Sequence, residues 1–353
     1  MKKVRLSDIA SELNVSVATV HRALCGSGRV SSETRQRIID AAKRMGYAPN
    51  VAARSLSSKS KIRFAVICTD NDFYRDILNA IEAAAQKYVT IDIKFDFMLT
   101  KHYSPIEQAE VLKKILEEHS KYTAIAIAPA HPLLLSPILQ ELKEKGIGIV
   151  TFDNDAPESG RSVFIGPNGY ISGKLCAQLY DLALPDNAEV ALLTSYVSAI
   201  GLNKRIEGFR DEGINSSLRL IGPFEYVDTE EEAYKFCKQI LSSHSPNAVF
   251  CNSMLGTLGC ARAIKEYAQN KVFFIGFDFN EKIKEYIQDG TLFATIYNYP
   301  ASQGSKITDN LISLFVSNTI ALDNEEIYSI PSSVIMRSNL QEYTSDSQVP
   351  INI

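Results

Sequence analysis

From about residue 62 onward, short apolar runs alternate with longer amphipathic stretches. Runs such as 62–68, 124–128 and 147–152 are hydrophobic at nearly every position, which is typical of strands buried on both faces of a parallel sheet. The stretches between them have the length and spacing of helices, and the same alternation begins again after about residue 162. This doubled pattern predicts two doubly wound lobes, each a parallel sheet covered by helices on both faces.

Three further segments follow the second alternation: an apolar run at 293–298, a helix of about 300–316, and a strand-like run at 327–336. The simplest use of these segments is to carry the chain back and forth between the lobes. We therefore expect one ligand-binding and dimerisation unit over about 62–345. Its expected first lobe is 62–160 plus 298–325, and its expected second lobe is 161–297 plus 326–345.

Charge divides the chain at the same place where the alternation starts. The net charge of −4 is the sum of a head and a body of opposite sign: residues 1–63 contain 13 basic and four acidic residues, a net charge of +9, and the rest carries −13. A small basic head needs a polyanionic partner, whereas the acidic body is repelled by that same partner.

The head contains three short helical segments within about 45 residues. Ser7, Ser16 and Ser31 precede apolar residues at helical spacing and are predicted N-caps of helices over about 7–13, 17–24 and 31–45. Two short helices joined by a tight turn form a helix-turn-helix unit, and the second one exposes small and polar residues that fit a major groove. The alternative is a basic three-helix bundle with no reading role.

Arg22 is the strongest candidate for base reading in the second helix. A guanidinium can bond a guanine edge in two places, although a phosphate contact is the alternative for this residue. Other basic residues of the head are expected to meet phosphates or water, which supports affinity and salt sensitivity but no sequence choice; they are Lys2, Arg5, Arg29, Arg35 and Lys59.

Five ordered motifs make residues 4–56 resemble the DNA-binding head of the lactose and galactose repressor family. They are Leu6-Ser7-Asp8-Ile9-Ala10, Val15-Ser16-x-Ala18-Thr19-Val20-x-Arg22, Val30-Ser31-x-x-Thr34-Arg35, Gly46-Tyr47-x-Pro49-Asn50 and Ala53-Arg54-Ser55-Leu56. The resemblance implies a helix-turn-helix domain over 1–48 and a hinge over 49–61 that forms a helix on DNA. It places a leucine wedge in the minor groove at Leu56, supported by Ala53, and base reading at Val17, Ala18 and Arg22.

The remaining DNA contacts implied by the resemblance fall on Ser7, Ser16, Thr19, His21, Arg29, Asn50 and Arg54. Two positions depart from the family pattern: His21 stands where a small hydroxyl residue is usual, and Cys25 where Asn is usual. A hinge of this length is too short to be helical alone, so it is expected to order only against a partner helix and a groove. The alternative is a plain linker.

The body resembles periplasmic sugar-binding proteins of the two-lobed kind, which that repressor family carries behind its head. The matching motifs are Asp72-Phe73-Tyr74, Arg205-x-x-Gly208-Phe209, Gly276-Phe277-Asp278 and Ala294-Thr295-Ile296-x-Asn298, whereas Asn252-Ser253 departs from the usual Asn-Asp. The expected fold is thus an all-α helix-turn-helix head followed by an α/β body of two doubly wound parallel-sheet lobes, like a type I periplasmic binding protein.

Ligands of such sheets bind beyond the carboxyl ends of the strands, where the lobes face each other. That rule and the motifs select ten effector-site candidates: Asp72, Phe73, Tyr74, Asp153, Asn154, Asn203, Arg205, Asn252, Asp278 and Asn298. The carboxylates can accept hydroxyl protons, the arginine can span adjacent oxygens, the amides can do both, and an aromatic ring can stack on C–H patches. This complement fits a sugar or polyol.

Five of these candidates also have a structural alternative. Asp153 and Asp278 can be helix caps, and Arg205 can pair at the surface with Glu207 or Asp211. Phe73 and Tyr74 can belong to the core instead.

Together these features predict a sequence-specific DNA-binding transcriptional regulator whose operator affinity depends on a small effector between two lobes. A repressor is favoured, and an activator is the alternative. Its expected partners are a pseudo-palindromic operator, a sugar-like ligand and a second copy of the chain. The alternatives are a solute-binding protein, or a regulator that senses a purine or an amino acid. We expect no enzyme activity, because the sequence has no GxSxG, Walker loop, HExxH or clustered metal ligands.

Composition adds several expectations about the setting of the protein. Its six cysteines are scattered without a CxxC pair, so we expect reduced structural thiols and neither a metal nor a cofactor. No window of about 18 apolar residues exists and the start lacks an apolar signal, so a cytoplasmic protein that does not enter the membrane is expected. The C-terminal residues show no heptad repeat, which favours a homodimer.

Overall fold

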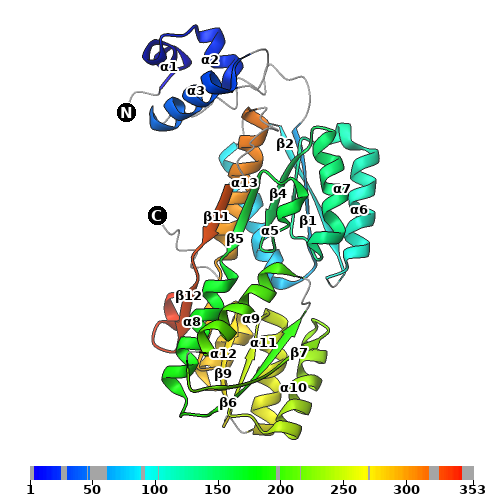
Figure 1. Ribbon diagram of the computed structural model, residues 1–353. Coiled ribbons are helices and arrows are strands. Elements are labelled where there is room, and N and C mark those ends of the chain that lie inside the picture. Colours follow the sequence, from blue (N-terminus) through cyan, green and yellow to red (C-terminus); the bar gives the residue numbers. More distant parts are fainter. Residues whose placement is uncertain are drawn as a thin grey trace.

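The computed structural model describes residues 4–24, 30–45, 47, 62–88, 92–101, 103–195, 199–214, 216–268, 271–317 and 326–343. Three helices form the head, drawn in blue in Figure 1: α1 (Leu6–Leu13), α2 (Val17–Leu24) and α3 (Ser32–Met45). Two lobes follow, each built on its own six-stranded sheet. The predicted fold class, a helical head and an α/β body of two mostly parallel sheets, is confirmed.

Two of the three predicted caps in the head are confirmed. The backbone N–H of Thr19 donates to Ser16 Oγ (3.0 Å), and that of Thr34 donates to Ser31 Oγ (3.3 Å). The prediction for Ser7 is wrong, because the helix begins at Leu6 and Arg5 takes the N-cap position. The Asp8 carboxylate accepts the Arg5 backbone N–H (2.8 Å), which stabilises this earlier start.

The head has its own small core, separate from those of the lobes. The side chains at its centre are apolar and come from all three helices: Ile9, Ala10, Val20, Ala23, Ile38, Ala41 and Ala42. Asn14, in the left-handed conformation with φ 53°, makes the tight turn between α1 and α2. This small core fixes α2 against the other two helices and leaves its opposite face to solvent.

The first sheet has the strand order β11-β5-β4-β3-β1-β2, and all its pairings are parallel. Its strands are β1 (Ile62–Thr69), β2 (Ile93–Thr100), β3 (Ala124–Ile127), β4 (Gly148–Phe152), β5 (Val163–Pro167) and β11 (Glu326–Ile330). Strands β1, β3 and β4 are buried along almost their whole length. This burial explains why they are apolar at nearly every position rather than at alternate ones.

The second sheet has the order β12-β10-β9-β8-β6-β7, and only the edge strand β12 runs antiparallel to its neighbour. Its strands are β6 (Glu189–Ser195), β7 (Arg219–Tyr226), β8 (Ala248–Cys251), β9 (Phe273–Phe277), β10 (Ala294–Tyr297) and β12 (Ser333–Met336). Strands β6 to β10 are parallel and stand in the same order in the second sheet as β1 to β5 do in the first. The second lobe therefore repeats the architecture of the first.

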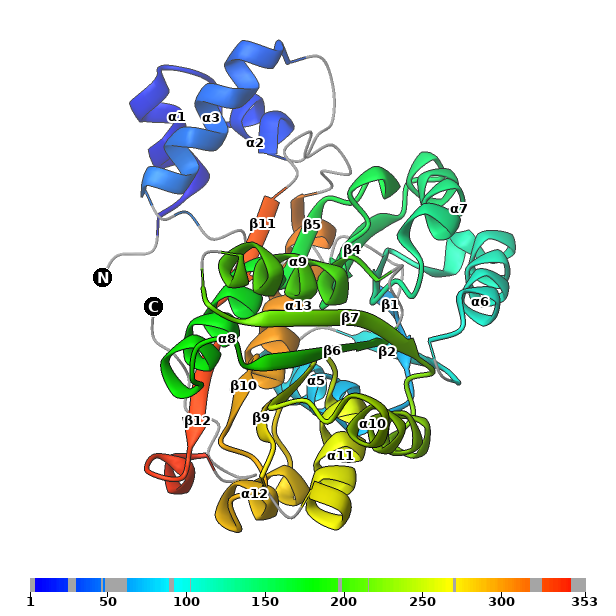
Figure 2. The ribbon, with the colours of Figure 1, turned by 60° about the horizontal axis from the view of Figure 1, so that its bottom comes forward.

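Helices cover both faces of each sheet (Figure 2). They are α5 (Asp72–Ala85), α6 (Pro105–Glu117), α7 (Pro132–Glu144), α8 (Gly169–Ala183), α9 (Ile200–Gly213), α10 (Glu230–His244), α11 (Met254–Ala263), α12 (Glu281–Gln288) and α13 (Pro300–Ser317). Among the helices that the structure describes, none combines the length and the apolar character needed to cross a bilayer.

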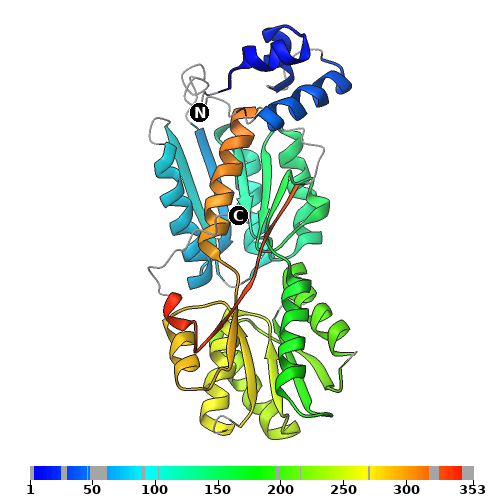
Figure 3. The ribbon, with the colours of Figure 1, turned by 90° about the vertical axis from the view of Figure 1, so that its left-hand side faces the viewer.

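Three segments of the chain connect the two lobes, and Figure 3 shows them side by side. The first joins β5 to α8, the second joins β10 to α13, and the third joins β11 to β12. The expected lobe boundaries are wrong at two places. Val163 of β5 pairs with Val150, and Glu326 of β11 pairs with Val163, so both strands belong to the first sheet rather than to the second lobe.

Glycines set the distance between α8 and α9 in the second lobe. A Cβ atom on Gly173 would lie 2.0 Å from the Arg205 carbonyl oxygen, and one on Gly208 would lie 2.0 Å from that of Tyr170. Only glycine allows two helix backbones to approach this closely. The contact fixes α9, and with it Arg205, at the edge of the lobe that faces the first lobe.

Five of the six cysteines lie in the described part of the chain, and all five are buried free thiols: Cys68, Cys176, Cys237, Cys251 and Cys260. Burial raises the pKa of the Cys68 thiol to about 12, so it stays protonated at neutral pH. These thiols pack as small apolar side chains, as the sequence predicts.

Candidate functional site

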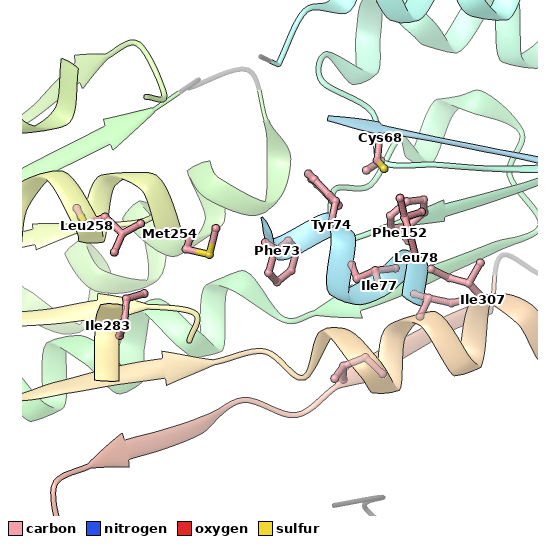
Figure 4. Packing of buried hydrophobic residues seen from close by; sticks show 14 of the residues in the cluster. Cys68, Phe73, Tyr74, Ile77, Leu78, Phe152, Met254, Leu258, Ile283 and Ile307 are labelled. Carbon is pink, nitrogen blue, oxygen red and sulfur yellow. The ribbon is translucent and has the colours of Figure 1, made fainter. Parts of the chain in front are cut away.

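A cavity lies between the two lobes, and side chains from both of them line it. The space between its walls that protein atoms leave empty, including the part open to solvent, is about 490 Å³. We call it the cleft; its lining residues are Asn71, Phe73, Tyr103, Asp153, Asn154 and Pro167 from one side, and Gly169, Gly201, Leu202, Arg205, Asp228, Ser253, Met254, Leu255 and Asp278 from the other. Figure 4 shows Phe73 of α5 opposite Met254 of α11, the apolar contact between the two walls.

Asp153 and Asp278 occupy equivalent places in the two lobes. Each directly follows a central strand, β4 or β9, and each has a left-handed backbone, with φ 57° and 64°. Their backbone N–H groups donate to the next strand of the sheet, at Ile165 (2.9 Å) and Ile296 (2.8 Å). The strained turn directs both carboxylates into the cleft. The helix-cap alternative for Asp278 fails, because Asn280 caps α12.

The two carboxylates have different supports. Asp153 accepts a hydrogen bond from the Tyr74 hydroxyl (2.7 Å), which also contacts the Tyr103 hydroxyl (2.6 Å). Asp278 accepts from the Asn298 amide (3.0 Å). Both are almost fully buried, so each keeps at least one donor as compensation for the water it has lost.

The pKa of Asp278 is raised to about 6, mainly by burial and to a lesser extent by the charges of Asp153 and Asp228, against the lowering effects of Arg205 and of the hydrogen bond from Asn298. Burial also raises the pKa of Asp153, while Arg205 and the Tyr74 hydroxyl lower it. The two carboxylates thus interact with the same guanidinium. At neutral pH the cleft holds strong hydrogen-bond acceptors in a water-poor setting, where they bind donors more strongly than in water.

Arg205 is buried, with 5% of its surface exposed. One terminal nitrogen donates to the Asn252 carbonyl oxygen (2.6 Å), and the guanidinium lies 4.4 Å from the centre of the Phe277 ring. Its Nε is buried and lacks a hydrogen-bond partner among the described residues. The alternative of a surface ion pair fails, because Arg205 is buried, Glu207 accepts from Asn203 and Lys204, and Asp211 accepts from the Tyr170 hydroxyl (3.0 Å).

Five predicted site residues do not line the cleft. Asp72 begins α5 at the surface and pairs with Arg75 (3.2 Å), and Asn203 donates to Glu207 (2.9 Å). Asp72 is exposed and Asn203 is half-buried on its helix, and both are bonded to a neighbour on the same helix instead of entering the cavity. The other three support the walls from behind: Tyr74 and Asn298 hold the two carboxylates, and Asn252 donates to Thr194 Oγ1 (2.7 Å) and the Leu202 carbonyl oxygen (3.0 Å).

The other predicted residues, namely Phe73, Asp153, Asn154, Arg205 and Asp278, do line the cleft. Sequence reasoning missed Tyr103 and Asp228, which lie shortly after the ends of β2 and β7. The rule that ligands lie beyond strand ends covers both positions. Both strands are the less buried edge strands of their sheets, so their sequences lack the continuous apolar run that marks a central strand.

The head presents the outer face of α2 to solvent. Val17, Ala18, His21 and Arg22 are exposed there, and Arg22 Nε donates to the Ala18 carbonyl oxygen (3.1 Å). Ser7 and Ser16 are exposed nearby, whereas Thr19 is half-buried and bonds Ser16 (2.7 Å). The predicted DNA contacts at Arg29, Asn50, Ala53, Arg54 and Leu56 lie outside the described residues.

Both parts of the chain match known families. Residues 5–50 match the model of bacterial regulatory proteins of the lacI family, and residues 62–317 match the periplasmic binding protein domain. The chain is a lacI-family regulator. A transcriptional regulator of Bacillus subtilis, DegA, is 26% identical over 78% of this chain and 82% of its own length. The sucrose operon repressor of Pediococcus pentosaceus is 25% identical over 80% and 85%. The chain is thus a DNA-binding transcriptional regulator.

Solved structures resemble the two-lobed body of this lacI-family protein. A glucose-galactose binding protein from Geobacillus stearothermophilus is 26% identical, with a TM-score of 0.72, over 80% of this chain and 99% of that one. A solute-binding protein from Burkholderia graminis, solved with D-arabinose, is 22% identical, with a TM-score of 0.74, over 81% and 99%. The second likeness shows the shared fold only.

Proposed function

We propose that this regulator is a transcriptional repressor that binds a pseudo-palindromic operator as a homodimer and responds to an uncharged sugar or polyol in the cleft. The observation that carries the proposal is the convergence of Asp153, Asp278 and Arg205, from two lobes, in one buried cavity behind a DNA-binding head. As a regulator of operator DNA it acts in the cytoplasm and has no enzyme activity. Its relatives are transcriptional regulators.

The chemistry of the cleft supports a polyhydroxy ligand. Asp153 and Asp278 accept hydroxyl protons from opposite sides, while Arg205 Nε is a buried donor that needs an acceptor. Phe73 and Met254 offer apolar surface for C–H patches. Several neighbours in fold have bound sugars or polyols, including D-arabinose and myo-inositol. A ligand with many hydroxyls satisfies these groups together.

DNA recognition is assigned to the exposed face of α2 in the head. Val17 can contact a thymine methyl, and Arg22 can bond a guanine edge in the major groove. The basic residues around α2 bind phosphates and make affinity depend on salt. Leu56, in the hinge, is proposed to insert into the minor groove between two half-sites.

Coupling between the two sites follows from the three segments that join the lobes. A ligand that bonds Asp153 on one wall and Asp278 on the other binds the closed arrangement better than an open one. Only such differential affinity can shift the equilibrium between two states. Closing the cleft changes how the first lobes of the two subunits meet, and thus the separation of the hinges at the operator.

The test is a gel shift on the DNA upstream of the coding sequence, with and without sugars. Arg22→Ala is expected to weaken binding at least tenfold, because it removes a base or phosphate contact. Arg219→Ala, an exposed arginine of the second lobe, is the matched control and should bind like the unchanged protein. Equal binding by all three proteins would contradict the role of α2.

A second variant separates the hinge from the cleft. Leu56→Ala should reduce operator affinity at least tenfold, because the wedge that stabilises the bent duplex is lost. Stabilisation by sugar, measured as the shift in Tm, should stay unchanged. A joint loss of both would indicate a misfolded chain and not a wedge.

A further inference from the structure

Asp228 is a cleft residue that none of the sequence motifs contains. It lies two residues after the end of β7, and only 5% of its surface is exposed. Ser253 Oγ donates to Asp228 Oδ1 (2.7 Å) and accepts the backbone N–H of Gly256 (3.0 Å). The single hydroxyl proton of Ser253 therefore points at the carboxylate, and the Tyr226 hydroxyl, 3.0 Å away, donates to Ser253.

This arrangement accounts for the departure at Asn252-Ser253. Ser253 caps α11 and brings no charge of its own into the cleft. It instead holds a carboxylate that comes from a different strand, and Asp228 enters the cavity beside it. The second lobe thus contributes two carboxylates to the cleft, Asp228 and Asp278, whereas the first lobe contributes Asp153.

The charges of the described lining residues do not balance. Three carboxylates, Asp153, Asp228 and Asp278, face one guanidinium, that of Arg205. The groups interact across the cavity: burial raises the pKa of Tyr103 well above its usual range, and the charges of Asp153 and Asp228 raise it further. Tyr103 therefore stays protonated, as a donor between acidic groups.

Arg205 offsets only part of this excess for a ligand, because its single positive charge faces three carboxylates. It lowers the pKa of both Asp153 and Asp278, so its charge already stabilises two carboxylates. One of its terminal nitrogens is also bonded to the Asn252 carbonyl oxygen. A phosphate brings a charge of about −1.5 to −2 and three acceptor oxygens, and a carboxylate brings a full negative charge. Such a group would meet more acceptors and negative charges than donors in a setting of low dielectric.

We propose that Asp228 is a specificity-determining residue, which restricts the cleft to uncharged or amine-bearing polyhydroxy ligands and excludes phosphorylated and carboxylated sugars. This inference rests on the proposed effector function of the cleft. A hydroxyl or ammonium group of the ligand donates to Asp228. A phosphate or carboxylate group at the same position of the ligand is repelled by the Asp228 charge. The protein then distinguishes uncharged from anionic sugars by repelling the anionic ones as well as by contacting the uncharged ones.

The experiment measures Tm shifts and calorimetric affinities of the full chain at pH 7.5 with three sets of probes. Uncharged probes are D-glucose, D-galactose, D-fucose, D-arabinose and myo-inositol; amine probes are D-glucosamine and D-galactosamine; anionic probes are D-glucose 6-phosphate, D-arabinose 5-phosphate and D-galacturonate. Binding is expected within the first two sets, at least tenfold tighter than for the anionic form of the same sugar.

Asp228→Asn is the decisive variant, because an amide oxygen can still accept from Ser253 while the charge is gone. It should bring the affinities for the uncharged and the anionic form of one sugar at least tenfold closer together. Asp186→Asn is the matched control, since Asp186 also accepts from a serine, Ser217 (2.8 Å), but outside the cleft. It should leave the ratio unchanged. A purely structural role of Asp228 would lower both affinities alike.

The outcomes separate the inference from the proposed function. Tighter binding of an anionic probe than of its uncharged parent overturns the inference and leaves a sugar-responsive repressor. An unchanged ratio in Asp228→Asn overturns the role of that residue. A chain that no probe stabilises, and whose operator binding no probe changes, contradicts the proposed effector function, and the inference falls with it.

Discussion

The two lobes present the same group to the cleft but hold it in different ways. Asp153 and Asp278 follow equivalent strands with the same left-handed turn. The Tyr74 hydroxyl that holds Asp153 belongs to the first lobe itself. Asn298, which holds Asp278, lies in the segment that crosses from β10 to α13. One carboxylate is thus tied to its own lobe, and the other to the connection between the lobes.

The connection extends beyond Asn298. Ser332, in the crossing between β11 and β12, donates to Asn298 Oδ1 (2.8 Å), and its hydroxyl also contacts that of Ser172 in α8 (2.9 Å). One chain of hydrogen bonds therefore joins Asp278 to elements at all three crossings. From this difference we expect contacts at Asp153 to affect only the affinity for the ligand. Contacts at Asp278 should also transmit ligand binding to the three segments that connect the lobes.

The largest effect is expected for Arg205→Ala, which removes the guanidinium that both carboxylates share. Buried carboxylates without their cation should cost about 4 kcal/mol of unfolding free energy at pH 8, measured by urea titration. The loss should shrink at pH 5, because Arg205 lowers the pKa of both groups and its removal favours their protonated forms. A loss no larger than that of the exposed control Arg219→Ala would contradict this shared role.

Asp278→Asn should stabilise the ligand-free protein while abolishing effector binding. Because the pKa of Asp278 is about 6 in the folded chain and about 3.9 when unfolded, its ionised form costs about 3 kcal/mol at pH 8. That cost grows as pH rises from about 4 to 6, so the gain of the variant should vanish below pH 4.

Asp153→Asn is the variant to compare with Asp278→Asn, because burial raises the pKa of the Asp153 carboxyl as well. The charged groups that act on Asp278 are Asp153 from the opposite lobe and Arg205 and Asp228 from its own lobe, and the Asp278 substitution leaves all three in place. Thermal melts of both variants from pH 4 to 8 provide the measurement. An Asp278→Asn protein that melts below the unchanged chain at pH 8 would refute the assignment.

Asn298→Ala and Tyr74→Phe test the two supports against each other. Each removes a hydrogen bond to a buried carboxylate, worth about 1–2 kcal/mol, or roughly 5- to 30-fold in effector affinity. Tyr74→Phe should only shift the sugar concentration needed to release the operator. Asn298→Ala should also reduce the largest fraction of operator that sugar can release in a gel shift, because the link from Asp278 to the segments that connect the lobes is lost. Identical sugar titration curves for the two variants would contradict the proposed difference between Asp153 and Asp278.

The smallest effect is expected for Ser332→Ala, which breaks the outer part of the same chain. It should weaken the response to sugar two- to fivefold, consistent with about 0.5–1 kcal/mol for a neutral, half-buried hydrogen bond. Ser217→Ala, a serine bonded to Asp186 at the surface, serves as the control and should leave the response intact. A Ser332 variant equal to that control would confine the coupling to Asn298.

Much of this architecture can be read from local patterns. The alternation of apolar and amphipathic segments predicted both lobes, and the rule of strand ends found Asp153, Arg205 and Asp278. Tyr103 and Asp228 escape the same rule, because the edge strands before them are only partly buried and lack a continuous apolar run. Asp72 and Tyr74 belong to one motif, yet helix geometry sends the first to the surface and the second behind the cleft wall.

The sequence by itself determined the charge split, the helical head, the two repeated α/β units and the residue types at the ends of their strands. These are local properties, because periodicity and capping depend on residues a few positions apart. Only the tertiary structure decided that β5 and β11 complete the first sheet and that Asp278 is bonded to Asn298 and, through it, to Ser332. Such pairings join residues distant along the chain, whose contact depends on the packing of all the elements between them.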